Sequence, residues 1–178
     1  MQMCFTLFLS IRSDINDSPP KFEWPIYNVS IAENTLPEYL LKVRASDGDV
    51  GPNAELTYTL EFDHENLFSL DSLTGILTLA HALDYELHTS YQLKAQVTDH
   101  GSHPLTDTCV INIFVIDQND HAPSIEMKFN PTLESNIDGT MAYVSESFDI
   151  QLPLAFVNVH DEDSGENGKV KKKKPSVN

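Results

Sequence analysis

The 178-residue sequence is short of positive charge and of cysteine. It has 11 Lys and Arg residues against 27 Asp and Glu residues, so the formal net charge is −16. Nucleic acids and anionic membranes are bound through basic surfaces, so neither is an expected partner. The two cysteines, Cys4 and Cys109, are too few and too far apart for a disulfide framework. Cys109 lies in a strand-like run, and we expect it to be a buried free thiol.

Long apolar runs and catalytic patterns are also missing. No apolar run reaches the ~18 residues that a transmembrane helix requires. The apolar segment 5–9 lacks a basic flank and a cleavage site, so we expect any export signal and membrane anchor to lie outside this sequence. The seven histidines are scattered, without a nucleophile–His–acid arrangement or a Cys/His metal spacing. Neither an enzyme nor a small-molecule substrate is therefore predicted.

What the sequence does contain is a series of short segments that alternate between apolar and polar residues. This period of two indicates β-strands, and no long helical period occurs. Turn signals recur every ~8–12 residues, as in the segment Asp71–Gly75. The sequence therefore predicts an all-β sandwich of seven strands. The expected strands span residues 22–32, 39–46, 56–60, 67–70, 76–79, 91–98 and 108–116.

Two acidic motifs each occur twice, about one domain-length apart. The segment Asp14–Pro20 has the form Asp-x-Asn-Asp-x-x-Pro, and Asp117–Pro123 repeats it 103 positions later. The segments Asp47–Asn53 and Asp161–Asn167 share the form Asp-x-Asp-x-Gly-x-Asn. This recurrence indicates one complete module between two joints, followed by the first part of another module.

The acidic motifs offer oxygen ligands for a hard cation. An isolated acidic cluster is most simply a solvated loop, but the recurrence of one spacing favours a metal site. Alternating Asp residues direct two carboxylates to one point, and Ca²⁺ takes six to eight such oxygens. Zinc would require Cys or His ligands. An EF-hand is excluded because Tyr58 and Lys172 stand where its twelfth loop position requires Glu.

These motifs together resemble the extracellular repeats of the cadherin superfamily, in particular those of protocadherins and of Dachsous- and Fat-type chains. Tyr85 stands where many repeats have Arg. The motifs that carry the resemblance are Ala32-Glu33-Asn34, Asp47-Gly48-Asp49, Leu83-Asp84-Tyr85-Glu86, Thr98-Asp99-His100-Gly101, Asp117-Gln118-Asn119-Asp120 and the Asp-Ser-Gly-Glu-Asn-Gly form at 163–168.

The resemblance implies a Greek-key, immunoglobulin-like sandwich, with one complete repeat and one truncated repeat. The implied boundaries are 1–19 for the end of a preceding repeat and the first calcium joint, 20–120 for the complete repeat, and 121–170 for the N-terminal part of a second repeat. A lysine run replaces the apolar alternation expected of the next strand, so 171–178 is expected to be a disordered or artefactual Lys-rich tail.

The resemblance also implies which residues bind calcium, with three ions at each joint. At the second joint the outermost ion is expected at Glu33, Asp84, Glu86 and Asp120. The middle ion is expected at Glu33, Glu86, Asp117, the Gln118 carbonyl, Asp120 and Asp163. The third ion is expected at Asn119, the His121 carbonyl, Asp161, Asp163 and the Asn167 carbonyl. The inner ligands of the first joint are expected to be Asn16, the Ser18 carbonyl, Asp47, Asp49, the Asn53 carbonyl and Asp99.

The function implied by the resemblance is calcium-dependent cell–cell adhesion, homophilic or heterophilic, with Ca²⁺ making the joints between repeats rigid. The partner would be a cadherin-family ectodomain on the same or the apposed cell. This module is expected on the extracellular side of the plasma membrane, and the parent protein is expected to span the membrane once through a segment absent from this sequence. The alternative function is a calcium-stiffened structural spacer without a recognition surface of its own.

Two further residues have a functional and a structural interpretation. Asn28-Val29-Ser30 is a glycosylation sequon on the polar face of its expected strand, so Asn28 is a candidate glycan site. Asn16-Asp17-Ser18 also fits the sequon, but Asn16 is an expected calcium ligand. Trp24 lies nine positions before Glu33, the spacing of the tryptophan that junctional cadherins exchange between partners. Because a joint precedes Trp24, we expect a packed or half-exposed strand residue instead.

Overall fold

The computed structural model describes residues 14–35, 39–61, 66–130, 134–135, 142–143 and 153–171. The chain divides into two compact units, Met1–Ile116 (unit 1) and Asp117–Asn178 (unit 2). The predictions made for residues 1–13 and for 172–178 lie outside the described residues. Among the described residues, no helix has the length and apolarity needed to cross a membrane.

Unit 1 consists of short strands and one turn of 3₁₀-helix, so the all-β prediction is confirmed. The elements of unit 1 are β1 (Lys21–Phe22), β2 (Ile26–Ala32), β3 (Tyr39–Lys42), β4 (Ala45–Ser46), η1 (Gly51–Ala54), β5 (Leu56–Leu60), β6 (Phe68–Leu70), β7 (Ile76–Leu79), β8 (Ser90–Asp99) and β9 (Thr106–Ile116).

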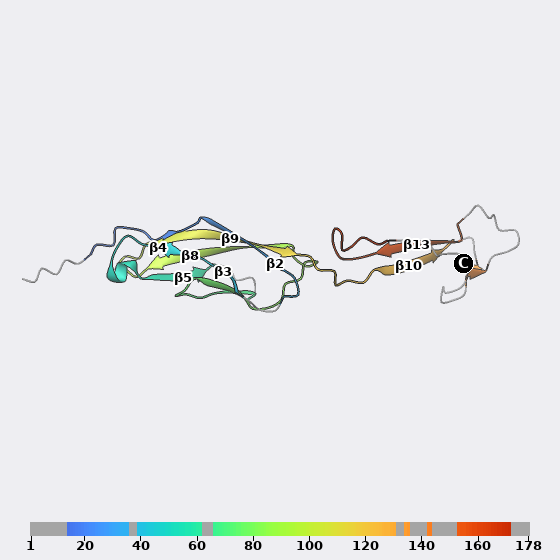
Figure 1. Ribbon diagram of the computed structural model, residues 1–178, viewed down its shortest axis with the longest axis horizontal. Coiled ribbons are helices and arrows are strands. Elements are labelled where there is room, and N and C mark those ends of the chain that lie inside the picture. Colours follow the sequence, from blue (N-terminus) through green and yellow to red (C-terminus); the bar gives the residue numbers. More distant parts are fainter. Residues whose placement is uncertain are drawn as a thin grey trace, which may run out of the picture. The chain divides into compact units, whose positions relative to one another are not determined.

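The strands of unit 1 form two main sheets. One sheet has the order β2-β9-β8-β5 and the other the order β3-β7-β6, while β1 pairs with β4. The strands of the four-stranded sheet run lengthwise along one another (Figure 1). Strand β2 is parallel to β9, with the register running from Ile26↔Val110 to Ala32↔Ile116. The other pairings in both sheets are antiparallel.

The core of unit 1 lies between these two sheets. Side chains alternate between the two faces of a strand, so every second residue of β8 and β9 is buried. Leu77 of β7 supplies the facing surface and is fully buried. Burial of each large apolar side chain stabilises the fold by about 1.5–3 kcal/mol. Phe68 and Tyr91 add an edge-to-face ring contact between the sheets, with centroids 5.4 Å apart.

Two of the expected strands are interrupted. The expected strand 22–32 breaks between β1 and β2, next to Pro25, which has no backbone N–H to donate. The expected strand 39–46 breaks between β3 and β4, where the Val43 amide donates to the Gly75 carbonyl at 2.9 Å. The register also shifts between Tyr39 and Leu41. The first break thus reflects the missing backbone donor of Pro25, and the second reflects a hydrogen bond to a neighbouring segment. Local alternation of apolar and polar residues reveals neither.

The turn predicted at Asp71–Gly75 is present and joins β6 to β7. The Asp71 carboxylate accepts hydrogen bonds from the Thr74 amide at 2.7 Å and the Thr74 hydroxyl at 2.6 Å. Gly75 has a φ of +69°, and a Cβ there would lie 2.5 Å from the Val43 carbonyl oxygen. Glycine is therefore required both by the backbone conformation and by the close approach of β3's continuation.

Unit 2 contains a two-stranded sheet of β10 and β13. These strands pair antiparallel, from Ser124↔His160 to Phe129↔Ala155. The elements of unit 2 are β10 (Ser124–Phe129), β11 (Glu134–Ser135), β12 (Ala142–Tyr143) and β13 (Ala155–His160). The repeat of the sequence motifs is thus matched by a repeat of local structure, because β10 and β13 pair as β1 and β4 do in unit 1.

Candidate metal centre

Oxygen-bearing side chains gather at the N-terminal end of unit 1, where the segment before β1, the loop after β4 and the end of β8 meet. Each of these segments is connected to another by a hydrogen bond that involves at least one side chain. We call this group the first oxygen cluster. Its residues are Asn16, Ser18, Asp47, Asp49, Asn53 and Asp99.

The loop after β4 is closed by its own carboxylates. Asp47 Oδ1 accepts a hydrogen bond from the Asp49 amide at 2.9 Å, and Asp49 Oδ2 accepts one from the Ser18 amide at 3.2 Å. Gly48 packs against Ser18, since a Cβ on Gly48 would lie 3.1 Å from Ser18 Oγ. The Asp47 carboxylate therefore closes the loop on itself, while the Asp49 carboxylate contacts the segment before β1.

Asp14 also holds the loop after β4, through hydrogen bonds from Val50 and Asn53. Asp14 Oδ2 accepts a hydrogen bond from the Val50 amide at 2.9 Å, and the Asp14 carbonyl accepts one from Asn53 Nδ2 at 3.2 Å. Asp14 was not among the expected ligands of the first joint. Its equivalence to Asp117 in the repeated motif was the signal that could have identified it.

Asn16 is oriented by Asp99 at the end of β8. Asn16 Nδ2 donates to both carboxylate oxygens of Asp99, at 3.1 and 3.2 Å, and to the His103 carbonyl at 2.9 Å. A Cβ on Gly101 would lie only 2.3 Å from Asn16 Nδ2. The amide nitrogen of Asn16 is therefore fully engaged, which leaves its carbonyl oxygen, Oδ1, as the group able to meet a cation.

Asp99 is buried, with 1% of its surface exposed. Burial disfavours the charged carboxylate, but hydrogen bonds from the Gly101 and Leu105 amides and from Asn16 outweigh it, so the pKa of Asp99 lies below its usual value. The two amides donate at 3.0 and 3.1 Å. Asp99 is therefore an ionised side chain in the interior of the cluster.

The chemistry of the first oxygen cluster fits a hard cation. Asp47 Oδ2 and Asn16 Oδ1 are buried oxygens with no hydrogen-bond donor within the described residues, and a buried acceptor without a partner is costly. Among those residues, no Lys or Arg forms an ion pair with Asp47, Asp49 or Asp99. Several carboxylate and carbonyl oxygens at one place form the ligand set that Ca²⁺ uses in proteins.

Unit 2 repeats the arrangement with its own residues. Asp163 Oδ1 accepts from the His121 amide at 3.1 Å, and Asp161 Oδ1 accepts from the Asp163 amide at 3.2 Å. Asp117 Oδ2 accepts from the Ser164 amide at 3.3 Å, as Asp14 does from Val50 in unit 1. We call this group the second oxygen cluster. Its residues are Asp117, Asn119, His121, Asp161, Asp163 and Asn167.

The second oxygen cluster passes the same test of fit. Asp117 Oδ1 and Asp163 Oδ2 are buried and lack a hydrogen-bond donor among the described residues. Asn119 Nδ2 donates to the Asn167 carbonyl at 3.2 Å. This hydrogen bond orients the side-chain amide of Asn119, as the bonds from Asn16 Nδ2 orient that of Asn16. His121 Nδ1 lies 2.9 Å from Asp120 Oδ1 and 3.1 Å from Asp163 Oδ1. Gln118 and Asp120 belong to the same leading segment of unit 2.

The remaining expected ligands lie at the other end of unit 1. Glu33 directly follows β2 and is 3% exposed, and its Oε2 accepts a hydrogen bond from the Tyr85 amide at 2.7 Å. This contact joins Glu33 to the segment that carries Asp84 and Glu86, which we call, with Glu33, the distal acidic group. Asp84 Oδ1 accepts from the Leu87 amide at 2.9 Å. The resemblance to cadherin repeats had implied that these three acidic residues act together, which remains a prediction.

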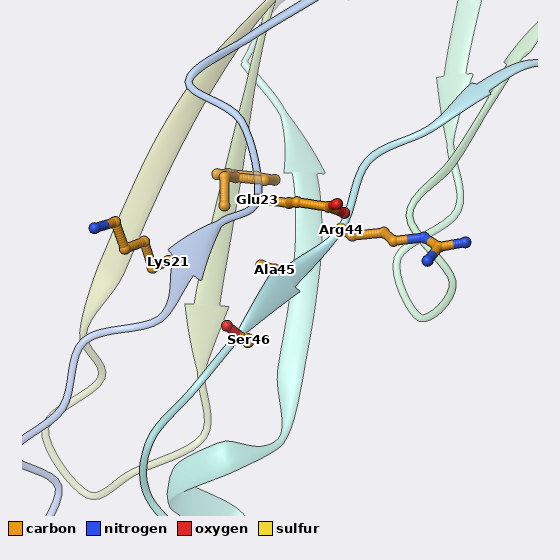
Figure 2. Close-up of a pocket in the computed structure, with 6 residues that line it drawn as sticks. Lys21, Glu23, Arg44, Ala45 and Ser46 are labelled. Carbon is orange, nitrogen blue, oxygen red and sulfur yellow. The ribbon is translucent and has the colours of Figure 1, made fainter.

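A surface pocket of about 450 Å³ lies beside the β1–β4 pair. It is lined in part by Lys21, Glu23 and Arg44. Figure 2 shows that the Lys21 and Arg44 side chains point away from each other, so their charges do not converge on one ligand. The pocket therefore does not form an anion site.

Two further predictions concern single residues of unit 1. Cys109 is a free, buried thiol, as expected; burial raises its pKa to about 12. Trp24 is 58% exposed and lies between β1 and β2, so the expectation of a packed or half-exposed strand residue is wrong in placing it within a strand, because the strand is interrupted next to Pro25.

A β-sandwich unit whose leading loops gather carboxylate and amide oxygens has the features expected of a calcium-binding repeat module. A family model described as the cadherin domain matches residues 27–116, slightly more than half of the chain. The chain belongs to the cadherin family, and its repeats are protocadherin-like. Cadherins are adhesion proteins that bind calcium and are not enzymes, so this membership confirms the prediction that the chain is not an enzyme.

Individual relatives are protocadherins. Human protocadherin gamma-B3 is 38% identical over 172 residues, covering 94% of this chain and 17% of the relative. Human protocadherin-7 is 35% identical over 162 residues, covering 89% of this chain and 15% of the relative. A solved structure of protocadherin gamma B2 extracellular cadherin domains 1–5 matches with a TM-score of 0.75 and 33% identity, covering 88% of this chain and 28% of that one. The chain thus spans about a sixth of the length of these curated relatives.

Proposed function

We propose that this chain is a calcium-binding extracellular module of a cell-surface protein and mediates calcium-dependent cell–cell adhesion. The observation that carries the proposal is that both units build the same oxygen arrangement from equivalent residues. In each unit, buried oxygens lack a hydrogen-bond donor among the described residues. Membership of the cadherin family supports the proposal, because calcium binding is a property of cadherin repeats.

At the first joint, the chain's own residues provide one inner calcium site. Asp47 and Asp49 supply carboxylates from one loop, and Asn16 supplies its side-chain oxygen because Asp99 holds its nitrogen. Asp99 therefore acts at least as a positioning residue and contributes its negative charge. The proposed ligands of this site are Asn16, the Ser18 carbonyl, Asp47, Asp49, the Asn53 carbonyl and Asp99.

At the second joint, the proposed ligands come from both sides of the motif Asp117–Pro123. The distal acidic group precedes this motif in the sequence, and the Asp161–Asn167 loop follows it. The proposed ligands are Glu33, Asp84, Glu86, Asp117, Gln118, Asn119, Asp120, His121, Asp161, Asp163 and Asn167, for several ions.

The mechanism of stiffening follows from charge repulsion. Carboxylates that are close together repel one another, and this repulsion favours a joint that opens and moves. When bound, Ca²⁺ would supply positive charge that offsets this repulsion, and the proposed ligands above would hold it. Extracellular calcium modules typically bind with a Kd of about 10⁻⁴–10⁻³ M, so the joints are stiff at millimolar calcium.

The proposed partner is the ectodomain of another cadherin-family protein, on the same or the apposed cell. A solved structure of protocadherin gammaB7 EC3-6, described as a cis-dimer, matches this chain with a TM-score of 0.66 and 30% identity. This relative supports assembly between ectodomains. We place the parent protein at the plasma membrane, with this module on the extracellular side.

Calcium titration by calorimetry tests the binding sites. The chain is expected to bind calcium in the range of about 10⁻⁴–10⁻³ M. Asp49→Asn and Asp163→Asn remove one charged ligand from the first and the second cluster, so each should weaken part of the binding at least about tenfold. Asp71→Asn is the matched control, because Asp71 lies in the turn before β7 and should leave both affinities unchanged. Absence of binding to the unsubstituted chain at 10 mM calcium would contradict the proposal.

Bead aggregation distinguishes adhesion from the spacer function. Beads coated with the chain should aggregate in 2 mM calcium and disperse in EDTA, and Asp49→Asn together with Asp163→Asn should prevent aggregation. Small-angle X-ray scattering with and without EDTA reports joint stiffness separately. Calcium-dependent dimensions without aggregation would support the spacer, and unchanged dimensions would reject the stiffening mechanism.

A further inference from the structure

The outer face of the β2-β9-β8-β5 sheet carries a row of amide side chains across three strands. Asn28 of β2 is aligned with Asn112 of β9, which is aligned with Gln92 of β8. Asn112 Nδ2 donates to Asn28 Oδ1 at 2.9 Å, and Gln92 Nε2 donates to Asn112 Oδ1 at 3.0 Å. Neither oxygen cluster contains any of these residues, so calcium binding does not account for the row.

The row fixes the orientation of the Asn28 amide. Because Asn28 Oδ1 accepts from Asn112, the nitrogen Nδ2 is on the opposite side of the amide group. Asn28 is exposed, and its Nδ2 has no hydrogen-bond partner among the residues that the structure describes. Ser30 is also exposed and points to the same face, because side chains two residues apart in a strand share a face. The two residues thus present the glycosylation sequon to solvent.

The second sequon, Asn16-Asp17-Ser18, has the opposite geometry. Asn16 Nδ2 donates to the two Asp99 oxygens and to the His103 carbonyl. Gly101 lies so close that an added Cβ would be 2.3 Å from this nitrogen. A sugar on Asn16 Nδ2 therefore cannot coexist with the folded first oxygen cluster, whereas a sugar on Asn28 displaces no contact.

We propose that Asn28 carries an N-linked glycan and that Asn16 does not. In the transfer, Asn28 Nδ2 forms a bond to C1 of the first sugar of a lipid-linked oligosaccharide. The bond from C1 to the diphosphate oxygen breaks, the lipid diphosphate leaves with the electron pair, and one amide proton is lost to solvent. The step involves no oxidation or reduction. The proposal relies on the extracellular location proposed above, since the sugar donor is met on the secretory route.

The glycan would cover apolar surface on this face. Ile26 is 54% exposed and Phe114 is 47% exposed, and both lie near Asn28 on the outer side of the sheet. Phe114 is aligned with Ser30, and Ile26 precedes Asn28 by two residues on the same strand. A sugar on Asn28 would extend from the same face as these two side chains, and we expect it to cover part of Phe114, which would remove apolar area from water.

Mass spectrometry of the secreted chain tests the attachment. The full chain is expressed in mammalian cells behind a cleavable signal peptide and mapped after enzymatic deglycosylation in ¹⁸O water. One glycan is expected, at Asn28, with none at Asn16. Ser30→Ala should abolish it, Ser30→Thr should retain it as the matched control, and Ser18→Ala should change nothing. Asn28→Gln provides a second loss-of-site variant if Ser30→Ala is not secreted.

Radical footprinting tests the position of the glycan. Labelling of Phe114 should increase at least about twofold after deglycosylation, while labelling of Tyr39, which is 57% exposed on β3 of the other sheet, should not change. An unmodified Asn28 in the secreted chain, or a glycan on Asn16, overturns the proposal. Calcium titration of the same sample tests the proposed function independently of the glycan. A glycosylated chain that binds no calcium would contradict the proposed function but would not contradict the glycosylation of Asn28.

Discussion

At the scale of single residues, Gly101 determines where the Asn16 side chain can lie. An added Cβ at Gly101 would come within 2.3 Å of Asn16 Nδ2 and 2.5 Å of Asn16 Cγ. Gly101→Ala should therefore displace Asn16, break its bonds to Asp99, and lower the free energy of unfolding by about 1–3 kcal/mol. Calcium affinity of the first cluster should fall as well. Denaturant unfolding and calorimetry measure the two effects.

The neighbouring substitution Ser102→Ala is the control for Gly101→Ala. Ser102 is exposed, and surface changes usually alter stability by no more than about 0.5 kcal/mol. If both variants bind calcium with the same affinity as the unsubstituted chain, the position of Asn16 is not important for the site.

Asp99 makes the stability of unit 1 depend on pH in a defined direction. Its pKa in the folded chain is below the ordinary value of 3.8, so its stabilising contribution is complete above pH 3.8 and is lost as the pH falls through the folded value. In EDTA, the free energy of unfolding should decrease with falling pH below about 4, and Asp99→Asn should show a smaller decrease. An equal slope for both proteins, measured by denaturant unfolding between pH 2 and 6, would exclude this role of Asp99.

The acidic loops of the two oxygen clusters could be predicted from residue spacing, because carboxylates at alternating positions meet when the loop closes, whereas the other cluster residues were implied by the resemblance to cadherin repeats. The repeated spacing indicated this closure, and the hydrogen bonds of Asp47 and Asp49 show it within unit 1. The contribution of Gly101 could not be predicted. It depends on the distance between the end of β8 and the segment before β1, residues far apart in the sequence.

At the scale of elements, the short strand β7 is held in place by the side chains that it buries between the sheets. Leu77 is fully buried in β7, whereas Leu73, in the turn before it, is 77% exposed. Leu77→Ala should lower the free energy of unfolding by about 2–5 kcal/mol, because it leaves a cavity between the sheets. Leu73→Ala should change it by at most about 0.5 kcal/mol. Urea unfolding followed by circular dichroism compares them; similar losses would mean that the core is not where we place it.

Strand positions were predictable where alternation and burial coincide, as in β8 and β9. They were less predictable in the 39–46 segment, where alternation placed Leu41, Val43 and Ala45 on one face. The structure buries Leu40 and Val43 and leaves Leu41 and Ala45 half-buried, because the register shifts between Tyr39 and Leu41. A bulge of this kind inserts a residue without changing the composition of the segment, so alternation alone does not reveal it.

At the scale of the whole molecule, unit 1 carries acidic residues at both ends of its four-stranded sheet. Asp99 ends β8 at the same end as Thr106 of β9, and Glu33 follows Ala32, which is aligned with Ile116 at the opposite end. The core between these ends is apolar and independent of the acidic residues. Unit 1 thus places buried acidic residues, Glu33 and Asp99, at opposite ends of one apolar core.

The parallel alignment of β2 and β9 determines how unit 1 responds to mechanical tension. The chain enters β2 at Ile26 and leaves β9 at Ile116, so a force on the two ends pulls these aligned strands in opposite directions along their length. Their hydrogen bonds are then loaded together in shear. Force applied instead between residues 90 and 116 opens the β8–β9 hairpin one pair at a time. Single-molecule pulling between residues 20 and 116 should therefore require a higher unfolding force, and equal forces would show that the ladder does not bear the load. Unit 1 is therefore expected to resist unfolding most when force acts between its two ends, parallel to β2 and β9.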